Sequence, residues 1–248
     1  MPTPSLALLD LREHRQPDQP ALLNDFIALY LRTFTDAAER EDPAQWAERL
    51  ERDLPEPQPR MHLLVAVESD AAGHNRVQGG LAFEYYRGSR CGLFTYLVVD
   101  PARQRRGLAR ALVARAIDIL KADARARGAP LRAVFAESED PALVAADGNA
   151  MAPRERLTAL SRLGARWIDI PYVQPTLVGG SGRCRHLFLL AFHHGGRDPD
   201  AIDGAAVRDF LHEFYRALGV ERPDEDADFL AQQSRIGARL PLKAIPTT

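Results

Sequence analysis

The sequence predicts a mixed α/β fold, in which a central sheet carries helices on its faces. Three apolar strand candidates follow one another at His62–Glu68, Val77–Tyr86 and Leu93–Val99. A long amphipathic helix follows, from Gly107 to about Arg127, where apolar or small residues recur every four positions. Strands outnumber helices and alternate with them only in the middle of the chain, which favours a mixed sheet.

Further elements are expected on both sides of this segment. They are a strand at Ser5–Leu11, a helix at Leu22–Phe34, a helix that begins at Asp42 and ends before Pro55, a strand at Leu131–Ala136, a helix at Arg154–Arg162, and strands at Ala165–Ile170 and His186–Phe192. Asp42 suits the capping position of its helix, and Pro43 suits the first helical position.

The pattern changes over residues 198–248. An apolar stripe that includes Phe210 and Phe214 predicts an amphipathic helix, and a weaker helix is expected from Asp226 to about Gln233. We therefore expect one α/β domain over residues 1–197 and a helical C-terminal extension over 198–248. The extension is expected to pack on that domain or on a partner subunit, and the sequence leaves a homodimer open.

Composition limits the classes of function. Of 248 residues, 46% are hydrophobic and 27% charged, which is typical of a globular protein. The formal net charge of −2 gives no basic field for nucleic acid or anionic lipid. The two cysteines, Cys91 and Cys184, do not form a disulfide framework, and no apolar run is long enough to span a bilayer. The expectation is a cytoplasmic protein that binds neither nucleic acid nor membrane.

The stretch Leu97–Arg110 carries the strongest chemical signal. A buried strand leads into a tight loop that opens directly into the long helix, whose first N–H groups and positive dipole end attract anions. Gly107 and Ala109 are small enough for a phosphate to approach the backbone. Four arginines add positive charge at the same point: Arg103, Arg105, Arg106 and Arg110. These features favour a phosphate or pyrophosphate ligand.

Two known phosphate-binding loops are excluded by spacing. The stretch has no Gly-Lys-Ser/Thr and no Gly-x-Gly-x-x-Gly, so it is neither a Walker loop nor a dinucleotide fingerprint. The simpler alternative is an ordinary turn between strand and helix with solvated arginines.

The hexapeptide Gln104-Arg105-Arg106-Gly107-Leu108-Ala109 resembles the Gln/Arg-x-x-Gly-x-Gly/Ala signature of the GNAT acetyltransferases. The order of elements from about Ser5 to Phe192 is also similar to that family. The resemblance implies a GNAT-type fold with a mixed, mostly antiparallel sheet, and acetyl-CoA as the acyl donor. It also implies the cofactor-binding residues, which are Leu97, Val98 and Val99 for the pantetheine arm and Arg103, Gln104, Arg105, Arg106, Gly107, Leu108, Ala109 and Arg110 for the pyrophosphate.

Acyl transfer to an amine requires that the amine lose its proton, since an amine of pKa about 10 is protonated at pH 7. The resemblance implies a Glu as base, a Tyr as acid and a strand N–H that polarises the thioester carbonyl, here that of Val99. The usual Glu position holds Leu93 and the usual Tyr position holds Leu160, so neither can act.

Other side chains are candidates for these roles. Glu84 alternates with Phe83 and Tyr85 and would point into the cleft as a base or substrate ligand, unless it is a solvated strand carboxylate. Glu137 and Glu139, expected after the fifth strand, are either substrate-binding groups or loop charges. Tyr96 is a candidate acid, against the alternative of a buried core tyrosine.

Two residues of a Pro-bracketed segment, Tyr172 and Gln174, are expected to line the acceptor pocket, since such segments often do so in the family that the chain resembles. The residues Cys184, His186, His193 and His194 are interpreted as structural or solvent-facing, because no second cluster completes four metal ligands. No metal is therefore expected. The long loop from Asp140 to Pro153 is either a lid or a substrate-specific insertion.

The function predicted from the sequence is transfer of an acetyl group from acetyl-CoA to a primary amine of a small molecule or peptide by direct attack. An alternative is a CoA-binding sensor or assembly module without catalysis, which the absent Glu and Tyr favour. A third hypothesis is an acyltransferase that forms esters or uses longer acyl chains. The sequence leaves the acceptor open among antibiotics, amino acids, polyamines and protein N-termini.

Overall fold

The computed structural model describes residues 6–35, 40–69, 74–144, 151–177, 182–194 and 198–246, without the side chains of residues 193 and 194. Nine strands form one sheet in the order β1-β2-β3-β4-β5-β7-β6-β9-β8. Their bounds are β1 Leu6–Asp10, β2 Arg60–Ser69, β3 Asn75–Tyr86, β4 Cys91–Val99, β5 Ala133–Glu139, β6 Arg166–Ile168, β7 Leu187–His194, β8 Ala201–Asp203 and β9 Arg239–Lys243. The β4–β5 pair is parallel and the other pairs are antiparallel.

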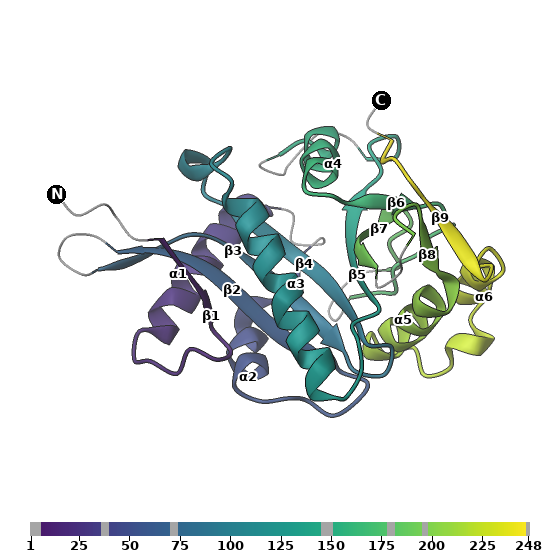
Figure 1. The fold of residues 1–248 in the computed structure, drawn as a ribbon, viewed down its shortest axis with the longest axis horizontal. Coiled ribbons are helices and arrows are strands. Elements are labelled where there is room, and N and C mark those ends of the chain that lie inside the picture. Colours follow the sequence, from purple (N-terminus) through teal and green to yellow (C-terminus); the bar gives the residue numbers. More distant parts are fainter. Residues whose placement is uncertain are drawn as a thin grey trace.

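Six α-helices accompany the sheet in the described residues. They are α1 Gln19–Thr33, α2 Trp46–Glu51, α3 Leu108–Ala126, α4 Pro153–Arg162, α5 Gly204–Ala217 and α6 Ala227–Gln233, with short 3₁₀ turns at Pro43–Gln45, Pro101–Arg103 and Pro223–Glu225. Figure 1 shows α3 crossing in front of β2 to β4, with α1 and α2 behind them and α5 beside the C-terminal strands.

Alternation along the strands divides the core between the two faces of the sheet. Leu64 and Phe83 pack in one cluster with α3 and α4, whereas Leu63 and Ala82 pack in another with α1 and α2. In the C-terminal half, Phe210 of α5 packs with residues of β5 and β7. Helices α3 and α4 therefore cover one face, and α1, α2 and α5 cover the other.

The long helix α3 confirms the four-residue repeat in the sequence. The repeating residues are all buried against the sheet: Leu108, Leu112, Ala116, Leu120 and Ala124. The helix is also fixed by a buried charge cluster. His62 of β2 is 1% exposed, and its ring nitrogens lie 2.8 Å from Asp10 of β1 and 2.8 Å from Asp123 of α3. Burial disfavours charge on the imidazole, but these two hydrogen bonds outweigh it and raise the pKa of His62.

The parallel strands β4 and β5 diverge part-way along their length. They pair from Cys91 to Phe94 and from Ala133 to Ala136, and among the described residues β4 has no strand partner on that side beyond Phe94. A register shift in the β3–β4 ladder leaves Thr95 without an opposite residue, which is the geometry of a β-bulge. The second half of β4 therefore exposes one edge of its backbone.

The predicted fold class and the order of the predicted elements are confirmed. Several boundaries differ by a few residues. The difference that affects the site is that β5 continues to Glu139 and so contains Glu137 and Glu139, which the sequence placed after the strand. Ser5 and residues 145–150 of the Asp140–Pro153 loop lie outside the described residues. No helix of the described chain is both long and apolar enough to cross a membrane.

The C-terminal residues also differ from the expectation of helices alone. Helices α5 and α6 are present, but β8 and β9 join the sheet, and β9 pairs with β6 through Trp167 opposite Lys243. Sequence reasoning missed β9 because the strand has only five residues and Pro241 at its centre, and proline within a run argues against a strand. The division at residue 197 stays a prediction.

Candidate functional site

The loop before α3 forms an anion-binding geometry. Gly107 adopts φ +81° and caps the helix, a left-handed conformation that favours glycine. The first helical hydrogen bond runs from the Ala111 N–H to the Gly107 oxygen, at 3.1 Å. The N–H groups of Leu108, Ala109 and Arg110 therefore have no acceptor within the helix and are available to an anion.

The four loop arginines do not play equal parts. Arg105, Arg106 and Arg110 are exposed at the helix start. Arg103 differs, because its guanidinium forms an ion pair with Glu68 and donates to Gln78 at 2.9 Å. These contacts fix the loop to β2 and β3, and direct binding of the cofactor by Arg103 stays a prediction.

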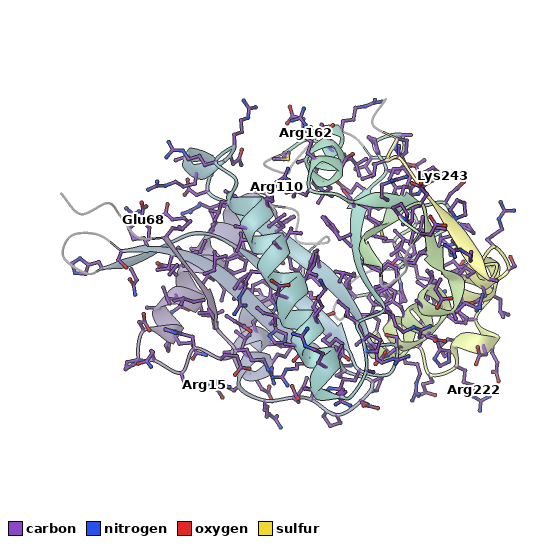
Figure 2. The ribbon with its side chains drawn as sticks, in the orientation of Figure 1. Arg15, Glu68, Arg110, Arg162, Arg222 and Lys243 are labelled. Atoms are coloured by element: carbon purple, nitrogen blue, oxygen red, sulfur yellow. The ribbon has the colours of Figure 1, made fainter. Side chains whose placement is uncertain are left out.

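Arg110 lies near the start of α3 and Arg162 on α4, as Figure 2 shows. The Arg110 guanidinium donates to the Arg162 carbonyl at 3.3 Å. This bond joins the two helices that cover one face of the sheet, beside the loop.

The backbone of β4 continues the site from the loop. The Asp100 N–H donates to Gln78 of β3 at 2.9 Å. Because N–H directions alternate along a strand, the N–H of Val98 faces β3, whereas those of Leu97 and Val99 face the edge that β5 leaves open. Of the three residues predicted to hold the pantetheine arm, Leu97 and Val99 can offer backbone groups to a ligand, and Val98 cannot offer its N–H.

A cleft of about 450 Å³ lies on the sheet face covered by α1, α2 and α5. Leu93 and Thr95 of β4 line it, so the cleft begins where β4 and β5 diverge. Five carboxyl side chains line it, from three separate parts of the chain: Glu41, Asp42, Glu84, Glu137 and Glu139. Glu139 is held in an ion pair with Arg156. The cleft thus brings acidic groups to the position that a ligand lying between β4 and β5 would reach.

Glu84 points into this cleft, as the sequence predicted, but its carboxylate is already bound. It forms an ion pair with Arg49 and accepts a hydrogen bond from the Tyr86 hydroxyl at 2.8 Å. Its side chain is 9% exposed. Both contacts occupy the carboxylate with partners from within the protein.

Glu137 has the properties of a base. Tyr172 and Gln174, the latter at 2.9 Å, donate hydrogen bonds to the same carboxylate oxygen. Burial raises the pKa of Glu137 to about 7, although these two bonds oppose the shift. A carboxyl group with a pKa near neutrality can take up a proton at physiological pH and release it again.

Glu41 is a second carboxyl group of this kind, and the sequence analysis did not single it out. Burial, together with the nearby charge of Glu84, raises the pKa of Glu41 to about 7. Its carboxylate lies 3.5 Å from Arg49. No sequence signal pointed to Glu41, because it lies in an ordinary polar stretch just before the Asp42 cap.

The sequence model of the acetyltransferase (GNAT) family matches residues 23–143, which include the β4–β5 divergence, the loop and α3. The chain belongs to the GNAT acetyltransferase family. Members of this family generally use acyl-CoA donors. No curated protein matches the sequence.

Solved structures of other GNAT proteins are similar to this chain at low sequence identity. A tandem GNAT protein from the clavulanic acid biosynthesis pathway is 21% identical with a TM-score of 0.46, and the match covers 68% of this chain but only 46% of that protein. The ribosomal-protein-S18-alanine N-acetyltransferase from Escherichia coli is 13% identical, with a TM-score of 0.42 and coverage of 79% and 98%. An aminoglycoside 6'-acetyltransferase type Ii is 15% identical, with a TM-score of 0.47 and coverage of 78% and 99%.

Tyr96 is a buried tyrosine at the edge of the cleft. It is 8% exposed and packs edge-on against Tyr30 and Phe34, with ring centroids 4.7 and 5.2 Å away. Its oxygen accepts a hydrogen bond from the Glu41 N–H at 2.9 Å, and burial raises the pKa of Tyr96. The residue therefore combines both sequence interpretations: it packs in the core and also lines the cleft.

The segment after β6 carries Tyr172 and Gln174, which were both predicted to line the acceptor pocket. Gln174 lines the cleft. Tyr172 is 5% exposed and is not among the described residues that line it. Its hydroxyl donates a hydrogen bond to the Glu137 carboxylate, and contact of Tyr172 with the acceptor stays a prediction.

The C-terminal residues form the far wall of the cleft, which the sequence analysis did not foresee. Phe214 and Leu218 line it. The Tyr215 hydroxyl donates to the Val173 carbonyl at 2.8 Å, and Arg183 forms an ion pair with Asp226 at the start of α6. These contacts fix the two chain segments that carry Gln174 and Cys184.

Cys184 and His186 contact each other rather than a larger metal-binding group. The Cys184 sulfur lies 3.3 Å from the His186 Nε2, and both residues line the cleft. No group of three or more metal-ligating side chains occurs among the described residues. The side chains of His193 and His194 lie outside them.

Proposed function

We propose that this GNAT protein transfers an acetyl group from acetyl-CoA to a primary amine, by direct attack of the amine on the thioester. The observation that carries the proposal is the placement of Glu137, a half-buried carboxyl group with a pKa of about 7, where the strands diverge. The loop supports binding of the pyrophosphate, through the open N–H groups of α3 and the exposed charges of Arg105, Arg106 and Arg110.

The proposed roles follow the geometry. Glu137 takes the proton from the ammonium group of the acceptor, and Gln174 and Tyr172 hold its carboxylate in place. The Val99 N–H, which faces the open edge of β4, stabilises the negative charge that develops on the thioester oxygen. Tyr96 is the candidate acid for the departing thiolate. Glu84 is the weaker candidate for the base, because its carboxylate is already bound to Arg49 and Tyr86.

The test combines binding and turnover. Calorimetric titration of acetyl-CoA should give saturable binding, and a panel of primary amines should include some that release free CoA thiol. The Glu137→Gln variant should bind acetyl-CoA as the parent does and release little thiol. A folded protein that does not bind acetyl-CoA would refute the proposal.

A second candidate is a CoA-binding module without catalysis. Leu93 and Leu160, at positions where the family often carries a base and an acid, favour it. Tight acetyl-CoA binding with no thiol release for any amine, at pH values above 7 where Glu137 is ionised, would support this module over the transferase. Rates of thiol release measured with acetyl-CoA and with longer acyl-CoA donors would show which acyl group the protein transfers.

A further inference from the structure

The Cys184–His186 pair has the geometry of an activated nucleophile. The sulfur and the imidazole Nε2 are 3.3 Å apart. The two residues are separated by one position in an extended segment, so their side chains project on the same side. Both line the cleft that begins at the β4–β5 divergence. A thiol beside an imidazole that can accept its proton is a recurrent arrangement in covalent acyl transfer.

The backbone places this thiol on the same side as Glu137. Gln174 and Cys184 form an isolated antiparallel bridge, with N–H to oxygen distances of 2.9 and 3.0 Å in the two directions. Directly opposite residues of an antiparallel pair project their side chains on the same face. Because the Gln174 amide reaches Glu137 at 2.9 Å, the Cys184 side chain also faces the region of the carboxylate.

We propose that Cys184 is a second acyl acceptor, which takes the acyl group from bound acyl-CoA when no amine occupies the cleft. This inference rests on the proposed function, since it requires acyl-CoA in the same cleft. His186 accepts the thiol proton, and the Cys184 sulfur attacks the thioester carbon. The new sulfur–carbon bond forms while the bond to the CoA sulfur breaks, and the CoA thiolate leaves with the proton from His186. One thioester replaces another, so no oxidant or reductant is needed.

The other cysteine is a matched control. Cys91 is fully buried, its thiol contacts the carbonyls of Ser89 and Ala206 at 3.5 and 3.8 Å, and burial raises the pKa of the Cys91 thiol to about 12. The thiolate is the reactive form of cysteine, so Cys91 should be inert towards acyl-CoA and towards alkylating reagents.

The experiment is incubation of the protein with acetyl-CoA in the absence of any amine, followed by desalting and intact mass analysis. The expected result is one added acetyl group, located on the Cys184 peptide and removed by neutral hydroxylamine, as a thioester would be and an amide would not. Cys91→Ala should acquire this group, and Cys184→Ala and Cys184→Ser should not. His186→Gln should slow its formation about 100-fold, the lower range for loss of a general base.

A second readout needs no turnover. Iodoacetamide should alkylate Cys184 faster than Cys91, and saturating acetyl-CoA should slow that alkylation. If calorimetry shows acetyl-CoA binding but Cys184 stays free of acetyl groups, the inference is wrong and the proposed transferase function stands. If acetyl-CoA does not bind the folded protein, the Cys184 inference and the proposed transferase function are both wrong.

Discussion

The phosphate loop and the cleft are two halves of one proposed site, and they are built in opposite ways. The loop is a single run of residues, 100–110, in which three of the four arginines are exposed and the backbone geometry depends on Gly107. The cleft is assembled from distant segments between Phe34 and Leu218, and Glu41, Glu84 and Glu137 in it are at least half-buried. A local site can be recognised in the sequence, whereas a site made by tertiary contacts cannot.

The two regions also present different ionisable groups, which match their proposed ligands. Exposed guanidinium groups suit a pyrophosphate, which arrives with its own negative charge. Carboxyl groups with raised pKa values suit an ammonium group, because a neighbouring cation would favour their ionised form. Substitutions in one region should therefore leave the other largely unaffected, and the following predictions test this separation from the largest expected effect to the smallest.

Glu137→Gln should lower kcat by about 100- to 10,000-fold, because a general base contributes about this much, and should leave the Kd of acetyl-CoA unchanged. In the parent protein kcat should rise as the pH increases through about 7, since Glu137 is the active base only after it loses its proton. Stopped-time assays of thiol release at a series of pH values around 7 would measure kcat and its pH dependence. Glu48→Gln, at a carboxylate that is 55% exposed on α2, is the control and should behave as the parent. A residual rise through pH 7 in Glu137→Gln would identify Glu41 as the base instead.

His62→Gln should destabilise the fold by about 3–5 kcal/mol, because it leaves Asp10 and Asp123 without the cation between them. The pKa of His62 is raised in the folded state, so its stabilising contribution is complete below the unfolded pKa of about 6.5 and is lost as the pH rises through the folded value. Urea unfolding at a series of pH values should show a loss of stability above about pH 6.5 in the parent that is absent in the variant. An equal pH dependence in both proteins would assign the loss to other groups.

Gly107→Glu should weaken acetyl-CoA binding about 100-fold, or about 2.7 kcal/mol, because it places a negative charge and a strained left-handed residue at the pyrophosphate position. Calorimetry would measure it. Gly128→Glu is the matched control: Gly128 has φ +73° at the other end of α3, so the substitution costs similar backbone strain without facing the ligand. Equal loss of binding in both variants would mean that strain in α3, rather than the loop, controls affinity.

Tyr215→Phe should cost about 1–2 kcal/mol of stability, since it removes the hydroxyl that bonds the Val173 carbonyl and Gln232. We expect a higher KM for the amine with an unchanged Kd for acetyl-CoA, because the bond holds the cleft wall and not the loop. Steady-state kinetics at fixed saturating acetyl-CoA would measure the first and calorimetry the second. A change in the Kd of acetyl-CoA with no change in the KM of the amine would contradict the separation of the two regions.

The sequence predicted most of the fold because its signals are local. The repeat in α3, the alternation in β3 and the Asp42 cap each depend on residues within one element, and the structure confirms all three. The loop was predicted for the same reason, except that Arg103 pairs with Glu68, a residue 35 positions away.

The acceptor side was only partly predictable. Glu84 and Tyr96 were identified by strand alternation and Glu137 by its expected position after the fifth strand, and all three line the cleft. The ion pair of Glu84 and the raised pKa of Glu137 were not predictable, because each depends on contacts with residues distant in the sequence. Glu41 was missed for a similar reason: nothing near it in the sequence indicates the apolar surroundings that the fold provides.

The late position of β9 has a consequence for synthesis of the protein. Ile168 of β6 pairs with Leu242 of β9, so this edge of β6 stays unpaired until β9 has been synthesised. At about 5–20 residues per second, the ribosome needs several seconds to make the residues between them. During that time the nascent chain carries an open strand edge next to an unfinished acceptor wall, whereas the loop and α3 can already fold. Chaperone dependence should therefore concentrate on the C-terminal half, and a premature stop just before Arg239 should yield protein that aggregates through β6.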